Sequence, residues 1–512
     1  MKECTMKKCK MKKRTTTKHK SIWTLSILVF ALSVAWGQDS TMPPATEPAP
    51  QSNPQQPVPA YGQENPPPTV TENPPLSGVD LPSLEPNTAP LSYIQPGATV
   101  SESADSNAGN VVGGSGVTSV SRALGSLTLK RLWSHYDLAL DYIGGVGYYS
   151  LSGEGLKLLQ QMDFDQKISW KRGQLSLRDS FSYLPEGNFG GAYGSLGSQG
   201  IASLGNSAFG GFWGGSSLGS LGLAPRILNV ALADVTENLT PKSTITAAGG
   251  YAFTHFYGND ETTGGSFIGS SQTSAQVGYD RILSSHTQVA LIYGYQGFDF
   301  SVEGTAFHSN IIQGLYGHRI SGRMDLLLGA GPQFTSINTQ GFACSDPSLP
   351  ILLCPPPDTI NPTTFKNTSV GVAAQARLRY KFTKTSLDLS YRRSETSGSG
   401  LFAGAQSDIV RLSATRPLSR VWSGFVDLGY SHNDRLQPAN GGVDANTYSY
   451  VFAGGGVQRA FGRNFHGYAS YQFNELWFDN SFCATTVSCD RISNRNVVTF
   501  GLDWTPRPIR ID

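Results

Sequence analysis

Few residues of this sequence could act directly on a reacting bond. His432 is followed two residues later by Asp434, and His466 is followed four residues later by Ser470. A histidine next to a carboxylate or hydroxyl can serve as a general base, but acyl transfer also needs a third group that completes the constellation. Neither pair has a recognisable third partner in the sequence. The sequence therefore predicts that the protein is not an enzyme and binds no cofactor.

Cysteine chemistry is the second candidate. Cys344 and Cys354 form one close pair and Cys483 and Cys489 another, and each pair lies in a segment with the composition of a loop. In an oxidising compartment such pairs predict two disulfides that staple loops. The alternative is a metal site made from the four thiols, but neither spacing is a CxxC pattern, so no metal is predicted.

Two groups of charged residues form a third candidate, because several of them stand two apart and therefore share one face of an extended strand. The basic group is Arg377, Arg379, Lys381, Arg392 and Arg411. The acidic group is Asp137, Asp141, Asp163 and Asp165. Whether these groups face one another depends on the elements that carry them.

The first 37 residues have the layout of a secretory signal. A basic cluster from Lys2 to Lys20 precedes the apolar run IWTLSILVFALSVAW and the small residues Ala35 and Gly37, so we expect cleavage after Gly37. The alternative, an uncleaved anchor, is disfavoured because the run is shorter than the ~20 residues of a spanning helix. Without this segment the chain keeps 30 basic and 36 acidic residues, or −6. With only 15% charged residues and 58 glycines, no nucleic-acid partner is expected.

Residues 38–96 differ in composition from the rest of the chain. They hold 16 of the 30 prolines and almost no periodic apolar pattern, which predicts a disordered, Pro-rich periplasmic tether. Two interpretations stay open: a spacer that binds a partner, and an unconstrained leader.

From residue 97 to residue 512, apolar and polar residues alternate along many segments. In VGYDRILSSHTQVALIYGYQ (277–296) this period of two runs on both sides of a short turn, as in a β-hairpin. Such hairpins recur, and their short turns alternate with long loops rich in Gly, Ser, Asn and Pro, of which 185–226 is the longest. This sorting is typical of outer-membrane barrels, which have short periplasmic turns and long extracellular loops. We count 18 strands, or 16 if the first two form a plug.

The alternating faces indicate where the lipid lies. In QMDFDQKISW the face that carries Asp163 and Asp165 must be wet, because buried unpaired charges are prohibitively unfavourable. The opposite, apolar face must then meet lipid. The fold class predicted is all-β, an antiparallel transmembrane β-barrel in the outer membrane of a Gram-negative bacterium, in contact with lipid and with the outer-membrane assembly machinery. Pro506 and Pro508 are expected to stop the last strand, and Pro332 to break the ladder locally.

In an 18-stranded barrel the basic and acidic groups lie about nine strands apart, as opposite pore-lining walls. We expect either a transverse field that orients polar solutes, or charge balanced locally by neighbours such as Asp388 and Lys167. The aromatic-bearing loop 185–226 either constricts the pore or acts as a surface epitope. The function predicted is a porin-like channel for small polar solutes or an envelope polymer. The alternative is a structural or adhesive barrel with a closed lumen.

The sequence resembles uncharacterised β-barrel porins of the bacterial outer membrane from acidobacteria-type genomes. The resembling segments are PPLSGVDLPSLEP (74–86), PGATVSESADSN (96–107), RDSFSYLPEGNFG (178–190), GHRISGRMD (317–325) and GLDWTPRPIRID (501–512). It is distantly similar to barrels associated with exopolysaccharide systems. That resemblance implies an envelope transport role without fixing a substrate. If the tether is a spacer that binds a partner, the partner expected is a periplasmic or exopolysaccharide-system component.

Overall fold

The computed structural model describes the strands of the chain and most of their short turns. The described residues are 75–77, 92–108, 116–150, 155–184, 225–257, 267–301, 305–343, 361–437, 445–479, 481 and 491–511. The predicted signal segment with its cleavage site at Gly37, most of the predicted tether, nearly all of the loop 185–226 and the four paired cysteines lie outside them. Among the described residues no helix is long and apolar enough to cross a membrane.

Within the described residues eighteen long strands follow one another. They are β1 (Tyr93–Asp105), β2 (Thr118–Leu132), β3 (Tyr136–Tyr149), β4 (Gly155–Trp170), β5 (Gly173–Leu184), β6 (Arg226–Thr240), β7 (Ser243–Phe256), β8 (Ser270–Ser284), β9 (Thr287–Phe300), β10 (Ala306–Ser321), β11 (Met324–Ala343), β12 (Asn361–Lys381), β13 (Ser386–Thr396), β14 (Ala405–Pro417), β15 (Trp422–Arg435), β16 (Thr447–Phe461), β17 (Phe465–Phe478) and β18 (Ile492–Trp504). A short strand, β19 (Ile509–Arg510), follows.

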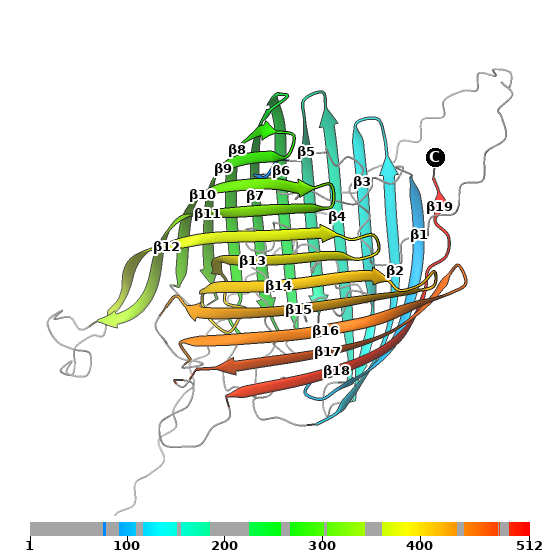
Figure 1. Cartoon of the computed structure of the whole chain (residues 1–512). Coiled ribbons are helices and arrows are strands. Elements are labelled where there is room, and N and C mark those ends of the chain that lie inside the picture. Colours follow the sequence, from blue (N-terminus) through cyan, green and yellow to red (C-terminus); the bar gives the residue numbers. More distant parts are fainter. Residues whose placement is uncertain are drawn as a thin grey trace, which may run out of the picture. The chain divides into compact units, whose positions relative to one another are not determined.

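These strands form a closed antiparallel barrel. Each strand pairs with the next along the chain, and β18 pairs with β1, so the sheet has no free edge. Strands of a barrel tilt against its axis, and in Figure 1 those on the near side therefore cross those on the far side steeply. Two-residue turns such as 171–172 and 285–286 lie at one end, which we assign to the periplasm.

The barrel begins earlier than predicted. Tyr93–Pro96 already belong to β1 and pair with β2, so the tether boundary at residue 96 is four residues late. Both β1 and β2 are part of the wall, and the 16-stranded alternative with a plug is wrong. The weak apolar pattern of β1 concealed its start.

The prolines act where they were expected, with one difference. The ladder between β10 and β11 lacks pairs between Ile311↔Gln333 and Gly314↔Ala330, which confirms a local break at Pro332. The β11–β12 ladder continues through this position. After Pro506 and Pro508 the chain resumes as β19 beside the start of β1, so the last strand is interrupted but not ended.

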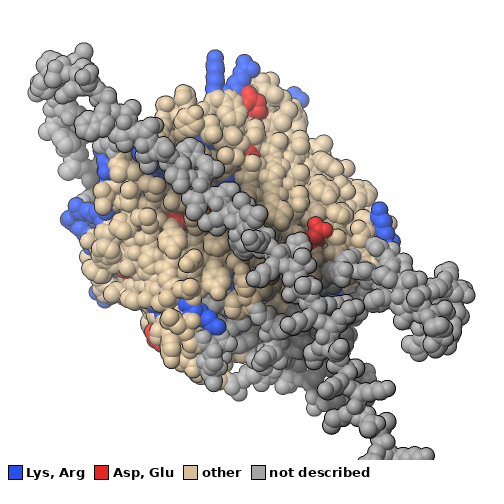
Figure 2. Space-filling view, turned by 180° about the vertical axis from the view of Figure 1, so that it is seen from behind, with Lys and Arg blue, Asp and Glu red and all other residues tan. Residues whose placement is uncertain are grey.

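The two faces of the sheet differ as predicted. Along β8 and β9 the outward side chains Val277 and Leu291 are 54% and 59% exposed, whereas the inward Asp280 and Gln288 are 3% and 8% exposed. In Figure 2 charged residues are sparse across the middle of the visible face and gather toward its margins. A closed barrel with an apolar outer belt and a polar interior is the β-form that crosses a bilayer. The protein is an outer-membrane β-barrel of a Gram-negative bacterium.

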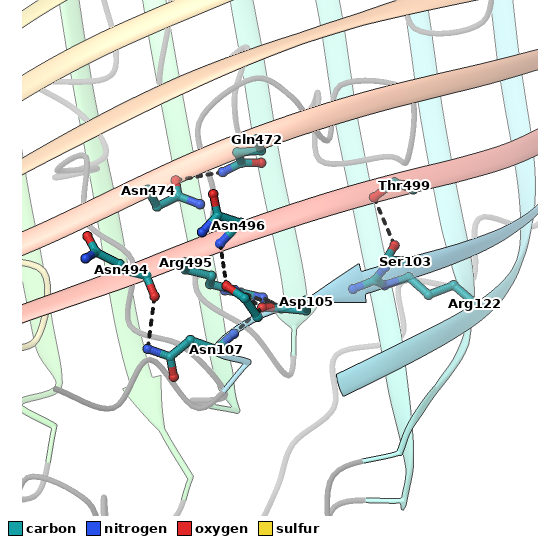
Figure 3. A network of polar contacts seen from close by, with 11 residues as sticks. Ser103, Asp105, Asn107, Arg122, Gln472, Asn474, Asn494, Arg495, Asn496 and Thr499 are labelled. Atoms are coloured by element: carbon teal, nitrogen blue, oxygen red, sulfur yellow. Dashed lines mark hydrogen bonds and ion pairs between the residues drawn. The ribbon is translucent and has the colours of Figure 1, made fainter. Parts of the chain in front are cut away.

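The seam between β1 and β18 carries a polar network on the inner face (Figure 3). Arg495, fully buried, donates through Nε to both carboxylate oxygens of Asp105, at 2.9 and 2.8 Å. Ser103 and Thr499 bond through their hydroxyls at 2.9 Å. Eight residue pairs join the two strands, so this network reinforces the pairing that closes the barrel.

Candidate functional site

The lumen is the candidate functional site, and all nine charged residues singled out from the sequence face it. Arg379 stands opposite Asp325 on one neighbouring strand and Asp388 on the other, which fixes the inner face of this wall. Asp163 stands opposite Asp141 in the same way. The two groups lie on β12–β14 and on β3–β4, about nine strands apart around the ring. Both groups lie in the half of the barrel near the short turns, apart from Arg392 and Arg411, which lie close to the middle of their strands.

The basic wall is largely paired with carboxylates. Arg377 donates through Nε to Asp388 at 2.8 Å, and Arg379 donates through Nε to Asp325 at 2.9 Å. A third pair of the same kind follows on β14 and β15, where Arg411 donates to Asp427 at 2.9 Å.

Arg392 differs from these arginines. It lies opposite Gln375 on the inner face and forms no ion pair with a described residue. An arginine that keeps its charge without a carboxylate beside it contributes a full positive charge to the lumen.

The acidic wall also contains basic residues that lie close to its carboxylates. Lys167 lies 3.5 Å from Asp165, and Arg178 lies 3.6 Å from Asp165 and 3.7 Å from Asp234. The hydroxyls of Thr128 and Ser180 donate to other carboxylates of the wall. The sequence singled out the acidic residues but not Arg178 and Asp234, because neither has another charged residue two positions away along its strand.

Local pairing reduces the charge of each wall without removing it. The five basic residues face Asp325, Asp388 and Asp427, which leaves two positive charges in excess. In the half near the short turns the acidic group with Asp234 makes five carboxylates, and Lys130, Lys167 and Arg178 leave two negative charges in excess. Toward the long loops the inner faces of β4 and β6 also carry Lys157 and Arg226. Neighbours therefore balance most of the charge in this part of the lumen, and a smaller charge of opposite sign remains on opposite walls.

The extracellular half of the lumen is shaped by the tip of the β13–β14 hairpin, residues 394–407. β13 pairs with β12 only as far as Arg393, and beyond that point the tip leaves the wall. The Glu395 carboxylate accepts a hydrogen bond from Thr335 on β11. The Gly400 carbonyl accepts one from the Ile268 amide at 2.9 Å, next to the start of β8. The tip therefore reaches across part of the mouth.

Aromatic packing holds this tip in place. Phe402 is fully buried and meets Tyr448 edge to face at 5.0 Å between ring centroids. The other buried members of the cluster are Ala405, Ala445, Tyr450, Phe452, Leu476 and Phe478. The segment GSGLFAG bends through positive φ angles at Gly398, Gly400 and Gly404, and this spacing of glycines around Leu-Phe was the signal in the sequence.

A short piece of the predicted tether also lies against the inner wall. The Ser77 amide donates to Asp280 Oδ1 at 3.0 Å, and its hydroxyl bonds Asp280 and Thr246. Gln276 Nε2 donates to the Ser77 carbonyl at 2.7 Å. Leu76 packs in a buried cluster with Ala290, Ile292 and Leu315. The sequence predicted that residues 75–77 belong to a disordered tether. They lie instead against the lumen wall, which supplies hydrogen-bond and packing partners for them.

The histidines lie apart from these features. His432 does have a third partner, which the sequence analysis missed: Nδ1 bonds Ser449 Oγ at 2.8 Å while Nε2 lies 3.3 Å from Asp434. This group is on the outer face of β15 and β16, and Ser449 is 5% exposed. The β16 amides are engaged in ladders on both sides, so they cannot stabilise an oxyanion as acyl transfer requires. His466 Nδ1 has no hydrogen-bond partner among the described residues.

Comparison with known proteins finds similarity to solved structures but to no protein family and no curated protein. Among solved structures, the open form of the ferric-catecholate import receptor Fiu from E. coli is 9% identical, with a TM-score of 0.41 and 82% of each chain covered. OccK2 (OpdF) of Pseudomonas aeruginosa is 10% identical with a TM-score of 0.37, over 82% of this chain and 98% of that one. A BenF-like porin from Pseudomonas fluorescens is 10% identical with a TM-score of 0.38, over 82% and 99%.

Proposed function

We propose that this barrel is a porin-like channel for small polar or charged solutes. The observation that carries the proposal is the pair of oppositely charged walls toward the short-turn end of the inner faces of β3–β6 and β11–β15. A barrel that served only as a scaffold would gain nothing from placing residual charge of opposite sign on opposite sides of its interior. In a water-filled pore such an arrangement orients dipolar solutes and selects among ions.

A second candidate function is a structural or adhesive barrel that acts through its extracellular loops. The observation that favours it is the buried tip of the β13–β14 hairpin, with Phe402 at the centre of a packed aromatic cluster. A mouth covered in this way reduces the open cross-section on one side of the barrel. The predicted transport of an envelope polymer would require this tip to move aside.

Single-channel recording of the refolded, signal-cleaved protein in a planar bilayer separates the two functions. A channel gives steady current steps, with a reversal potential under a salt gradient that reports the charge of the walls. A variant that lacks the tip residues 398–404 is the comparison, because it removes the cover while leaving the wall strands intact. Silence of both proteins would exclude the channel and support the structural barrel.

A further inference from the structure

The docking site for Leu76 and Ser77 is fitted to its occupant. Inward-facing glycines stand beneath both residues: a methyl group on Gly278 would lie 2.3 Å from Ser77 Cβ, and one on Gly317 would lie 2.8 Å from Leu76 Cδ2. Elsewhere on the inner face a glycine can stand in open space, since a methyl group on Gly371 would have no atom within 4 Å. Glycine at positions 278 and 317 therefore leaves the space that Ser77 and Leu76 occupy, which a larger side chain would fill.

The chemistry of the wall changes at the same place. Ala290, Ile292 and Leu315 form an aliphatic patch on the inner wall beside the polar residues Gln276, Asp280 and Gln288. Without Leu76 these side chains would face the aqueous lumen, which is unfavourable for apolar surface. Beside them, the Asp280 carboxylate accepts hydrogen bonds from both the amide and the hydroxyl of Ser77. The site thus combines a hollow for one aliphatic side chain with acceptors and donors for one extended backbone residue.

The place of this site in the barrel gives it access to the solute path. It spans β7–β11, between the acidic wall on β3–β6 and the basic wall on β11–β15, and it lies in the periplasmic half. Ser77 is 1% exposed and Leu76 6% exposed. A segment held there occupies cross-section beside both charged walls.

We propose that the inner face of β7–β11 is a peptide-binding site whose occupant is the chain's own Leu76–Ser77 segment, and that its occupancy narrows the channel from the periplasmic side. This inference rests on the channel function proposed above. Fourteen residues separate Ser77 from Ser92, the residue before β1. A short tether of this kind gives an effective concentration of ~1 mM at the site. Weak contacts then suffice to keep the site filled, and the segment can leave it without disturbing the barrel.

The test is single-channel conductance of full-length, signal-cleaved protein that carries Gly278→Val, which places a side chain where Ser77 lies. Gly371→Val is the matched control, because it adds the same side chain to the inner face of β12 in open space. Ser77→Glu is a second variant that leaves the barrel unchanged and sets a carboxylate against Asp280. A synthetic peptide of residues 73–80, added on the periplasmic side, is the probe for rebinding.

We expect Gly278→Val and Ser77→Glu to conduct severalfold more than both the wild type and the Gly371→Val control. The peptide should return Ser77→Glu to the wild-type conductance and leave Gly278→Val unaffected. Equal conductance of all four proteins would overturn the narrowing role while leaving the channel function intact. Silence of all four would overturn both proposals together.

Discussion

The ion pair between Asp105 on β1 and Arg495 on β18 gives a quantitative prediction for the free energy of unfolding. The change is Asp105→Asn, which removes the negative charge that faces Arg495 across β1 and β18. Both side chains are 1% exposed, and the guanidinium donates to both carboxylate oxygens. The variant leaves a fully buried arginine without its counter-charge, and removing one partner of such a pair destabilises a protein by about 3–5 kcal/mol.

Two comparisons isolate this effect. Arg393→Gln breaks an ion pair with Asp408 on the outer face, where Arg393 is 41% exposed, and should lower the free energy of unfolding by ~1 kcal/mol or less. The double variant Asp105→Leu with Arg495→Met replaces both charges by apolar side chains of similar length. Since no charge is then buried unpaired, it should recover most of the stability that Asp105→Asn loses.

Urea unfolding in detergent, followed by tryptophan fluorescence, measures all three proteins. Asp105→Asn should unfold at clearly lower urea than Arg393→Gln, with an unchanged dependence on urea if the same surface is exposed. An Asp105→Asn protein as stable as Arg393→Gln would refute the role of the seam pair. So would a double variant that is no more stable than the single one.

The lumen and its cover give two further predictions. Arg392→Gln removes the positive charge that no described carboxylate pairs with, so the reversal potential under a salt gradient should shift toward cation selectivity, whereas the outward-facing Arg393→Gln should leave it unchanged. An equal shift in both variants would show that the wall charges do not act on the permeating ions. Phe402→Ala deletes a fully buried ring from the β13–β14 tip, which should loosen the cover by about 3–5 kcal/mol and give a larger, noisier current; a current identical to that of the wild type would mean that the tip does not limit the path.

Local patterns in the sequence determined the wall of the barrel. The second strand of the hairpin expected at 277–296 is found as β9 (Thr287–Phe300), because the alternation of apolar and polar residues is a property of each strand by itself. Charge decided which face is wet, since Asp163 and Asp165 could not meet lipid. The alternation of short turns and long loops then gave the antiparallel order and the two ends of the barrel.

The contacts inside the barrel depended on the tertiary structure. Arg379 and Asp325 are 54 residues apart in sequence, and only the register between β11 and β12 brings them together. The inward course of the β13–β14 tip depends on aromatic partners contributed by β16 and β17. Neither the ion pair nor the packing of the tip can be predicted from the alternation of residues within one strand.

The position of Leu76 and Ser77 inside the barrel could not be predicted from the sequence. The sequence around Leu76 and Ser77 has the composition of an unfolded spacer, and nothing within it supplies hydrogen-bond partners. Those partners stand 169 to 203 residues away, on strands that become neighbours only once the barrel has closed. The sequence by itself therefore determined the strands and their lipid-facing sides, because these follow from local periodicity. What occupies the interior was decided by the folded wall, because only there do distant strands present a surface with a particular shape and charge.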